Sequence, residues 1–196
     1  MTQIYLRQAQ LADRDTIMQI IADAKAAMKK AGSPQWQDGH PNATMITEDI
    51  TKKIGWVLMI EQQIAGYVAM QLTPDPAYQH VRNGQWAQPD QPYATFHRVV
   101  ISGHFRGHHL GQFLISNLLT LGLAKGFTNF RLDTHHVNAA MQGLAESCGF
   151  EQRGEIEVDD KIDPRRIAFE LNLDQSHLIR QHVDNDFMKP LLHHDK

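Results

Sequence analysis

The sequence predicts a single-domain α/β protein in which helices flank a central sheet. The chain has 196 residues, enough to bury one sizeable core, and 42% of them are hydrophobic, which is ordinary for a globular protein. Short apolar or β-branched runs alternate with longer runs whose apolar residues recur every three to four positions. No internal repeat or second core is visible, so we expect one domain over residues 3–172 and a polar tail over residues 173–196.

Hydrophobic spacing predicts five elements before residue 73. They are a strand over 4–7, a helix capped by Asp13 and ended at Gly32, a helix over 46–54, and two strands over 56–60 and 64–72. The last two strands form a hairpin. Two stretches lack a regular pattern: residues 34–44 and residues 73–92, which contain four prolines. Loops of the second length are often binding loops.

The next segment carries the clearest functional signal. A strand over 93–101 ends in three β-branched residues, and a helix begins at Leu110, where apolar residues recur every three or four positions. The loop between them contains Arg106 and Gly107. The first N–H groups of a helix lack internal partners and favour an anion, and glycine allows close approach of a ligand. Residues 106–111 therefore predict a phosphate site.

Four further elements follow, separated by short polar segments. They are a strand over 129–132, a helix over 138–148, and two strands over 150–158 and 165–171. Gly126 ends the preceding helix.

The phosphate segment resembles a known signature. Val99-x-Ile101 followed by Arg106-Gly107-x-x-Leu110-Gly111 is similar to the acetyl-CoA-binding motif of the GNAT superfamily of N-acetyltransferases, usually written Arg/Gln-x-x-Gly-x-Gly/Ala. The resemblance implies acetyl-CoA as cosubstrate, bound by Val99, Val100, Ile101, Arg106, Gly107, His108, His109, Leu110 and Gly111. His109 stands where the family usually has its first glycine. Its N–H stays available to an anion if that residue is helical.

A second block supports the resemblance. Asn138, Leu144, Glu146 and Gly149-Phe150 are similar to the later family helix Asn-x-x-Ala…Leu-Tyr-Glu-x-x-Gly-Phe. The order β-α-α-β-β-β-α-β-α-β-β is also that of the family, which implies a mixed, mostly antiparallel sheet. By resemblance Asn138 contacts the pantetheine arm of the cofactor, although it would equally cap its helix. Ala145 replaces the tyrosine that often protonates the departing thiolate.

Acetyl transfer to an amine requires the neutral amine, and a lysine-like amine is almost fully protonated at pH 7. We interpret His97 as the general base, because imidazole titrates near neutrality. Regular strand alternation places it on the same face as Val99 and Ile101. The alternative is a hydrogen-bonded histidine at a strand edge. Arg98 then faces the other way, as a salt-bridge or surface residue.

Metal, membrane and nucleic-acid binding are not expected. The adjacent histidines 108–109, 135–136 and 193–194 point apart on a regular element, and the single cysteine, Cys148, fits packing better than metal binding. A formal net charge of −3 argues against wholesale nucleic-acid binding. The N-terminus has no signal-peptide pattern, and no apolar run approaches a membrane span, so a cytoplasmic protein is expected. A homodimer is left open.

Three functions remain. The first is an N-acetyltransferase that moves acetyl from acetyl-CoA to a primary amine of a small molecule or to an exposed protein amine. The second is a non-catalytic acyl-CoA-binding module, which the substitutions at His109 and Ala145 favour. The third is a Rossmann-type nucleotide binder, disfavoured because no Gly-x-Gly-x-x-Gly follows the first strand. The acceptor is expected to be selected by loops 33–44 and 73–92, where Trp36 and Trp86 lie.

Overall fold

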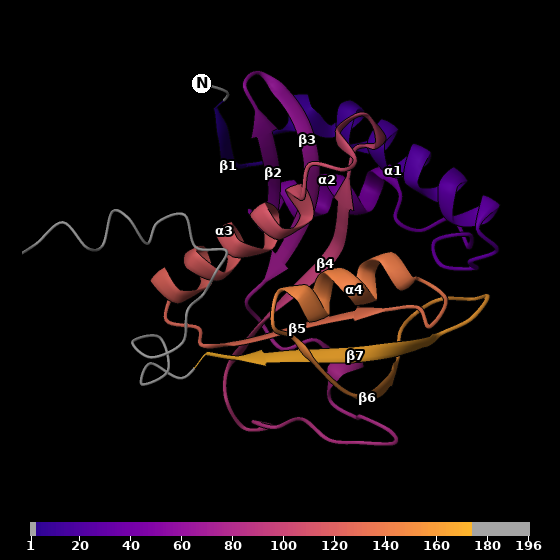
Figure 1. Cartoon of the computed structure of the whole chain (residues 1–196), viewed down its shortest axis with the longest axis vertical. Coiled ribbons are helices and arrows are strands. Elements are labelled where there is room, and N and C mark those ends of the chain that lie inside the picture. The colour runs from indigo at the N-terminus through magenta and orange to yellow at the C-terminus, as the bar shows by residue number, and fades with distance from the viewer. Residues whose placement is uncertain (1–2, 174–196) are drawn as a thin grey trace, which may run out of the picture.

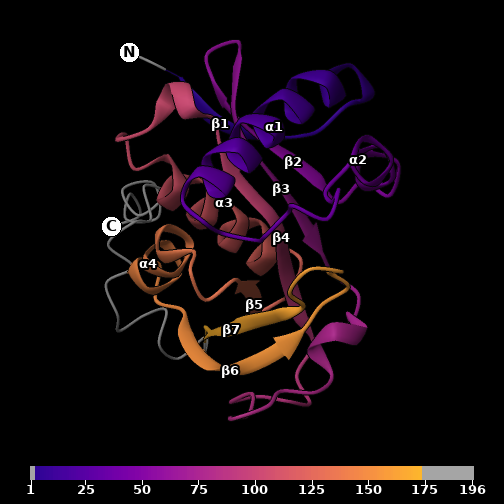
Figure 2. The same cartoon turned by 90° about the vertical axis from the view of Figure 1, so that its right-hand side faces the viewer.

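The computed structural model describes residues 3–173. One seven-stranded sheet has the order β1-β2-β3-β4-β5-β7-β6 and carries helices on both faces (Figures 1 and 2). The strands are β1 (Ile4–Gln8), β2 (Gly55–Ile60), β3 (Gln63–Gln71), β4 (Tyr93–Ile101), β5 (Asn129–Thr134), β6 (Glu151–Glu157) and β7 (Arg165–Asn172). The α-helices are α1 (Arg14–Lys30), α2 (Ala43–Thr51), α3 (Leu110–Ala124) and α4 (Ala139–Ser147).

The predicted fold class and element order are confirmed. All strand pairs are antiparallel except β4 and β5, which run parallel. Asp13 is a correction: its side chain makes no cap bond to α1. Its carboxylate instead accepts hydrogen bonds from the Gln10 N–H and from Arg7, because a turn of 3₁₀ helix precedes α1. Residues 174–196 of the predicted tail, with His193 and His194, lie outside the described residues.

Each face of the sheet has its own core. On one face α1 and α2 bury Ile17, Ile21 and Ile46 against Val57 and other residues of the sheet. On the other face α3 and α4 pack over a larger cluster that contains Phe96, Phe130 and Phe150. These two layers fix the backbone of β4 from both sides.

Strands β4 and β5 define two zones that matter for the site. In the paired zone, Tyr93–Phe96 is hydrogen-bonded in register with Asn129–Leu132. In the open zone, His97–Ile101 and Asp133–Thr134 continue without pairing to each other. The strand edge of β4 that faces this gap therefore has no β-strand neighbour, and its backbone groups are left for a ligand or water.

The loop over residues 73–92 is held against the paired zone. The guanidinium of Arg131 lies between the rings of Trp86 and Tyr93, at 4.1 and 3.9 Å from their centroids, and pairs with the buried Glu170 at 3.1 Å. The Trp86 indole N–H donates to the carbonyl of Tyr78. Trp86 is thus an anchor for this loop and not part of a pocket lining.

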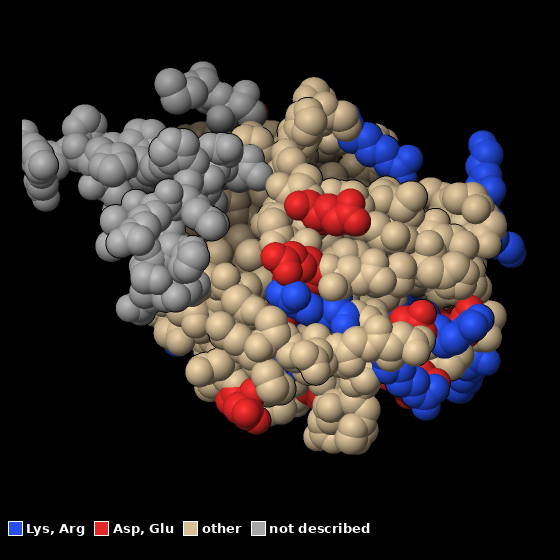
Figure 3. All heavy atoms as spheres, turned by 60° about the horizontal axis from the view of Figure 1, so that its bottom comes forward, with Lys and Arg blue, Asp and Glu red and all other residues tan. Residues whose placement is uncertain are grey.

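Charge is mixed on the part of the surface drawn in Figure 3, where Lys and Arg side chains lie beside Asp and Glu. Ion pairs in β6 and its neighbours include the exposed pair Arg82 with Glu157 and the pair of the half-buried Arg153 with Glu151. Within residues 3–173, no helix has the length and apolar character needed to cross a bilayer.

Candidate active site

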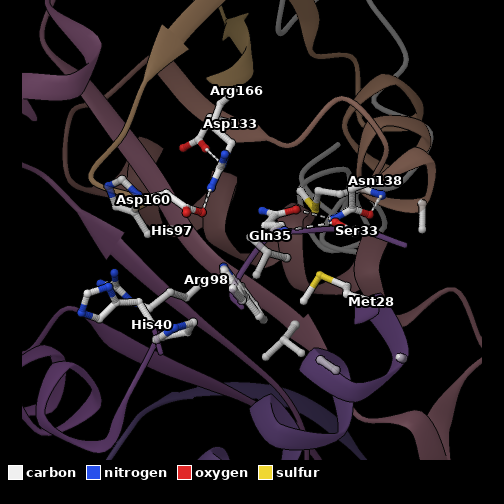
Figure 4. A pocket seen from close by; sticks show the side chains of 18 of the residues that line it. Met28, Ser33, Gln35, His40, His97, Arg98, Asp133, Asn138, Asp160 and Arg166 are labelled. Atoms are coloured by element: carbon white, nitrogen blue, oxygen red, sulfur yellow. Dashed lines mark hydrogen bonds and ion pairs between the residues drawn. The ribbon is translucent and has the colours of Figure 1, made fainter. Parts of the chain in front are cut away.

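A cleft of about 750 Å³ opens where β4 and β5 separate. Its walls come from the C-terminal part of α1, the loop after it, the open zone, the start of α4 and the β6–β7 loop. Figure 4 shows two ends of this cleft: His97, Asp133, Asp160 and Arg166 surround one, and Met28, Ser33, Gln35 and Asn138 surround the other.

The structure brings together part of the predicted site. His97, Arg106 and Asn138 line the cleft, and so do the three β-branched residues Val99, Val100 and Ile101. The remaining predicted residues, Gly107, His108, His109, Leu110 and Gly111, lie beside it and are not among its lining residues. Loop 33–44, which was expected to select the acceptor, supplies a wall that includes Trp36, whereas loop 73–92 supplies none of the lining.

The backbone of β4 departs from regular alternation at Arg98. That residue has a φ of 57°, and the pairing with β3 slips there, so that Arg98 and Val99 together oppose a single residue. Because of this β-bulge, Val99 and Ile101 share the core face with Phe96. The expectation that His97 shares a face with Val99 and Ile101 is therefore wrong. His97 instead contacts the ring of Tyr78 edge-on, with centroids 5.9 Å apart.

A buried ion pair holds the bulge. The Arg98 guanidinium donates two hydrogen bonds to Asp49 of α2, at 2.7 and 2.8 Å. The same carboxylate accepts the hydroxyl of Tyr67 at 2.8 Å, and burial beside Asp49 raises the pKa of Tyr67. A left-handed backbone costs a non-glycine residue about 1–2 kcal/mol. Two charge-assisted bonds of about 1.5–3 kcal/mol each offset that strain. The predicted salt-bridge role of Arg98 is confirmed.

The segment before α3 presents a run of free amides. Within the described residues, the N–H groups of residues 106–111 make no hydrogen bond, and the first helical bonds are those of Gln112 and Phe113 to the carbonyl of His109. His109 itself is not helical: it lies in the left-handed region at φ 55° and ends the loop. The condition that His109 is helical is therefore not met. Consecutive free N–H groups and the charge of Arg106 are still features that suit an anion, and residues 106–111 are called the anion cradle below.

Helices α3 and α4 explain two of the unusual residues. A Cβ atom on Gly111 would lie 2.9 Å from Leu144 of α4, so the glycine permits close helix packing, and Gly111→Val would test that packing as much as a ligand. Ala145 is fully buried in the core between these helices. A tyrosine there would overpack the core instead of reaching the cleft.

The amide of Asn138 is engaged at both ends. Its oxygen accepts the N–H of Met141, which caps α4, and its nitrogen donates to Gln35 at 2.9 Å. Gln35 is a buried residue of the loop after α1, and it also accepts the hydroxyl of Thr134. Sequence reasoning missed Gln35, because a glutamine in an irregular loop has no distinguishing pattern.

Histidines 135 and 136 do not point apart, contrary to expectation. Their rings lie 4.1 Å apart, and their nitrogens gather with Asp163 within 4.8 Å of one another. Both nitrogens of His135 are in use, since Nδ1 accepts the N–H of Val137 and Nε2 faces Asp163 at 3.2 Å. Burial lowers the pKa of His135. Cys148 is half-buried against the core, in keeping with packing, and burial raises the pKa of its thiol.

Known proteins share both the sequence pattern and the fold. The family model described as the Acetyltransferase (GNAT) family matches residues 19–150. A GNAT-family acetyltransferase from Streptococcus agalactiae 2603 is 32% identical, with a TM-score of 0.79, over 88% of this chain and 96% of that one. No curated protein matches the sequence.

Two more distant structures share the fold and contain cofactor. A protein from Salmonella typhimurium, solved with its cofactor acetyl-CoA, is 18% identical with a TM-score of 0.63 over 88% of this chain and 95% of that one. The enzyme AAC(6')-Ib, solved with ribostamycin and coenzyme A, is 14% identical with a TM-score of 0.66 over 92% and 98%.

The sheet splays at its one parallel pair in the described residues, β4 and β5, and free amides follow the splayed strand β4. The chain belongs to the GNAT acetyltransferase family, which uses acetyl-CoA for acyl transfer. The alternative of a Rossmann-type nucleotide binder is wrong, because only one strand pair of the sheet is parallel.

Proposed function

We propose that this protein is an N-acetyltransferase that moves the acetyl group of acetyl-CoA to a primary amine of a small molecule, or to an exposed protein amine. The observation that carries this proposal is the cleft at the open zone. The cleft runs from Arg106, beside the anion cradle, to an end lined by His97 and by several aspartates. These aspartates include Asp133, Asp159 and Asp160.

The cofactor would lie along the open edge of β4. The free N–H groups of residues 106–111 and the charge of Arg106 suit a pyrophosphate. Asn138 lies on the cleft wall at the start of α4, where its amide would meet the pantetheine arm if it exchanged Gln35 for the ligand. The thioester carbonyl would accept a hydrogen bond from a backbone N–H of β4 within residues 99–101, where β5 does not pair with β4.

An ammonium acceptor loses two protons on its way to the amide, one to a base before the attack and one to water after it, and the coenzyme A thiolate takes one up. His97 would take a proton from the ammonium group, and the amine nitrogen would then attack the thioester carbon. The C–S bond breaks as the new C–N bond forms. Because Ala145 is buried and carries no acid, the coenzyme A thiolate would take its proton from water. Asp133 and Asp160 share the guanidinium of Arg166, and Asp159 lines the same end, so carboxylates outnumber cations there and favour a cationic acceptor. Nearby carboxylates hold such an acceptor protonated, so it needs a base.

The test is thiol release from acetyl-CoA with a panel of polyamines, amino sugars, amino acids and lysine peptides, each corrected for hydrolysis without acceptor. We expect transfer to at least one amine class. His97→Gln is expected to lower kcat about a hundredfold, with the Kd for acetyl-CoA nearly unchanged. If coenzyme A binds tightly but no amine is acetylated, the non-catalytic acyl-CoA-binding module is the better description.

A further inference from the structure

The ring of His97 has one nitrogen turned toward a carboxylate of the long loop before β4. His97 Nε2 lies 3.2 Å from Asp75 Oδ2, and the two side chains are only 16% and 21% exposed. The contact is at ion-pair distance, although its direction is not that of an aligned hydrogen bond, and no other described group bonds Nε2. Such catalytic contacts often tighten only when the reacting complex forms.

Asp75 is held in place by contacts that have nothing to do with His97. Its Oδ1 accepts the N–H of Ala77 at 2.9 Å and so caps the short 3₁₀ helix Pro76–Tyr78. Its own N–H donates to the hydroxyl of Tyr93 at 3.1 Å. Only Oδ2 is turned to the imidazole. The histidine beside it lowers the pKa of Asp75, so the carboxylate stays charged.

The other ring nitrogen is left for the cleft. Within residues 3–173 no group hydrogen-bonds His97 Nδ1, and this atom, unlike Nε2, is not enclosed. A proton on Nε2, opposite Asp75, leaves the lone pair of Nδ1 free. That tautomer is the one a general base at this position requires.

We propose that Asp75 is the positioning residue of the reaction: it selects the Nε2-protonated tautomer of His97 and stabilises the imidazolium that forms when Nδ1 accepts the proton of the acceptor amine. This inference rests on the proposed function and adds to it a residue that lies outside the cleft lining. The proton moves from the ammonium nitrogen to Nδ1, and Asp75 itself stays ionised throughout.

Other charged groups also surround His97 and must be kept constant in a test. Tyr78 packs on the ring and donates its hydroxyl to Asp133, while Arg98 is neutralised by Asp49. The remaining charged or titratable groups of the cleft near His97 are Asp38, His40, Asp159, Asp160 and Arg166. None of them is altered by a change at Asp75.

The experiment compares Asp75→Asn with the wild-type chain. Asparagine keeps the cap on Ala77, so the fold should survive, and a thermal melt checks this. We expect kcat to fall about tenfold with the KM for acetyl-CoA unchanged, and the midpoint of the pH profile of kcat/KM to move about one unit lower, because the neutral amide no longer stabilises imidazolium. Asp75→Glu should recover part of the rate. Asp15→Asn, an exposed change on α1, is the matched control and should leave the profile as it is.

The outcomes separate the two proposals. If the wild-type protein acetylates an amine but Asp75→Asn has the same kcat and pH profile, the role of Asp75 is overturned and the proposed function stands. If kcat falls but the pH profile does not move, Asp75 only supports the loop, and its proposed role is overturned. The same holds if a lower melting temperature explains the fall in kcat. A wild-type protein that acetylates no amine overturns both.

Discussion

Strands β4 and β5 use their residues differently in the paired zone and the open zone. In the paired zone Phe96 and Phe130 are buried, with ring centroids 5.6 Å apart, and Arg131 is fully enclosed by aromatic rings and Glu170. In the open zone the same strands present His97 and Asp133 to a cleft. The first four residues of each strand thus pair and stabilise the fold, and the residues that follow them in each strand line the site.

The difference has a physical cause. A parallel pair satisfies the backbone of both strands, so its side chains are free to pack on either face. Once the strands part, the backbone of β4 must find other partners, and the bulge at Arg98 redirects each side chain after it. Changes in the paired zone should therefore act on stability, and changes in the open zone on catalysis.

The largest expected effect lies in the paired zone. Phe130→Ala removes a fully buried ring, which typically costs about 3–5 kcal/mol of unfolding free energy. Urea denaturation measures that loss, and the Kd for acetyl-CoA of the folded fraction should be unchanged. If Phe130→Ala unfolds at the same urea concentration as the wild type but has lost acetyl-CoA affinity, the assignment of the paired zone to stability is wrong.

The next effect comes from the ion pair that holds the bulge. Asp49→Asn leaves the Arg98 guanidinium without its carboxylate, and we expect a loss of about 2 kcal/mol together with a fall in kcat, since the β4 edge loosens. Tyr67→Phe removes only one hydrogen bond to the same carboxylate and should cost about 1 kcal/mol. Equal kcat values for Asp49→Asn and the wild type would mean that the bulge does not depend on this pair.

A smaller effect is expected at the cradle. Gly107 has a φ of 82°, and no atom lies within 4 Å of the place an added Cβ would take, so Gly107→Ala adds backbone strain of about 1 kcal/mol without a clash. The KM for acetyl-CoA should rise about fivefold. Gly143→Ala, at an exposed position of α4 where an added Cβ meets no atom, is the matched control and should not change KM. An identical KM for both variants would remove Gly107 from the cofactor site.

The smallest effect concerns pH. Burial lowers the pKa of His135, just beyond the open zone, so the unfolded chain binds a proton at a higher pH than the folded chain does. Stability from this group is present above about pH 6.5 and is lost as the pH falls toward 5. His135→Gln should reduce that loss in urea titrations at the two pH values. His80→Gln, a change at an exposed histidine, should keep the wild-type slope. The same slope in both variants would contradict the assignment.

The sequence predicts most of what lies in regular elements. The bounds of β4 at Tyr93 and Ile101 are confirmed, as is the helix from Leu110, because β-branched residues mark the end of the strand and helical spacing starts at Leu110. The left-handed backbone at Arg98 has no such signal, since arginine rarely adopts it and the buried Asp49 that compensates lies far away in the sequence. The predicted facing of His97 failed for that reason.

Loop residues were the least predictable part of the site. Gln35 and Asp160 reach the cleft from segments without periodicity, and their positions depend on contacts between distant parts of the chain. Asp75 lies among prolines in a loop that sequence reasoning expected to select the acceptor, yet it stands behind His97 and outside the lining. The contact between Asp75 and His97 depends on the folded loop and cannot be predicted from the spacing of the two residues in the sequence.

The contact between Gly111 and Leu144 acts as a spacer. A Cβ on Gly111 would come within 2.9 Å of the leucine, so the size of one leucine side chain sets how closely the first turn of α3 approaches α4. One N-terminus carries the amides before Gln112, and the other carries Asn138. Residues 111 and 144 are therefore coupled in size: a bulkier residue at one position requires a smaller one at the other. A change at one position alone would shift α4, and with it Asn138, relative to the amides before Gln112.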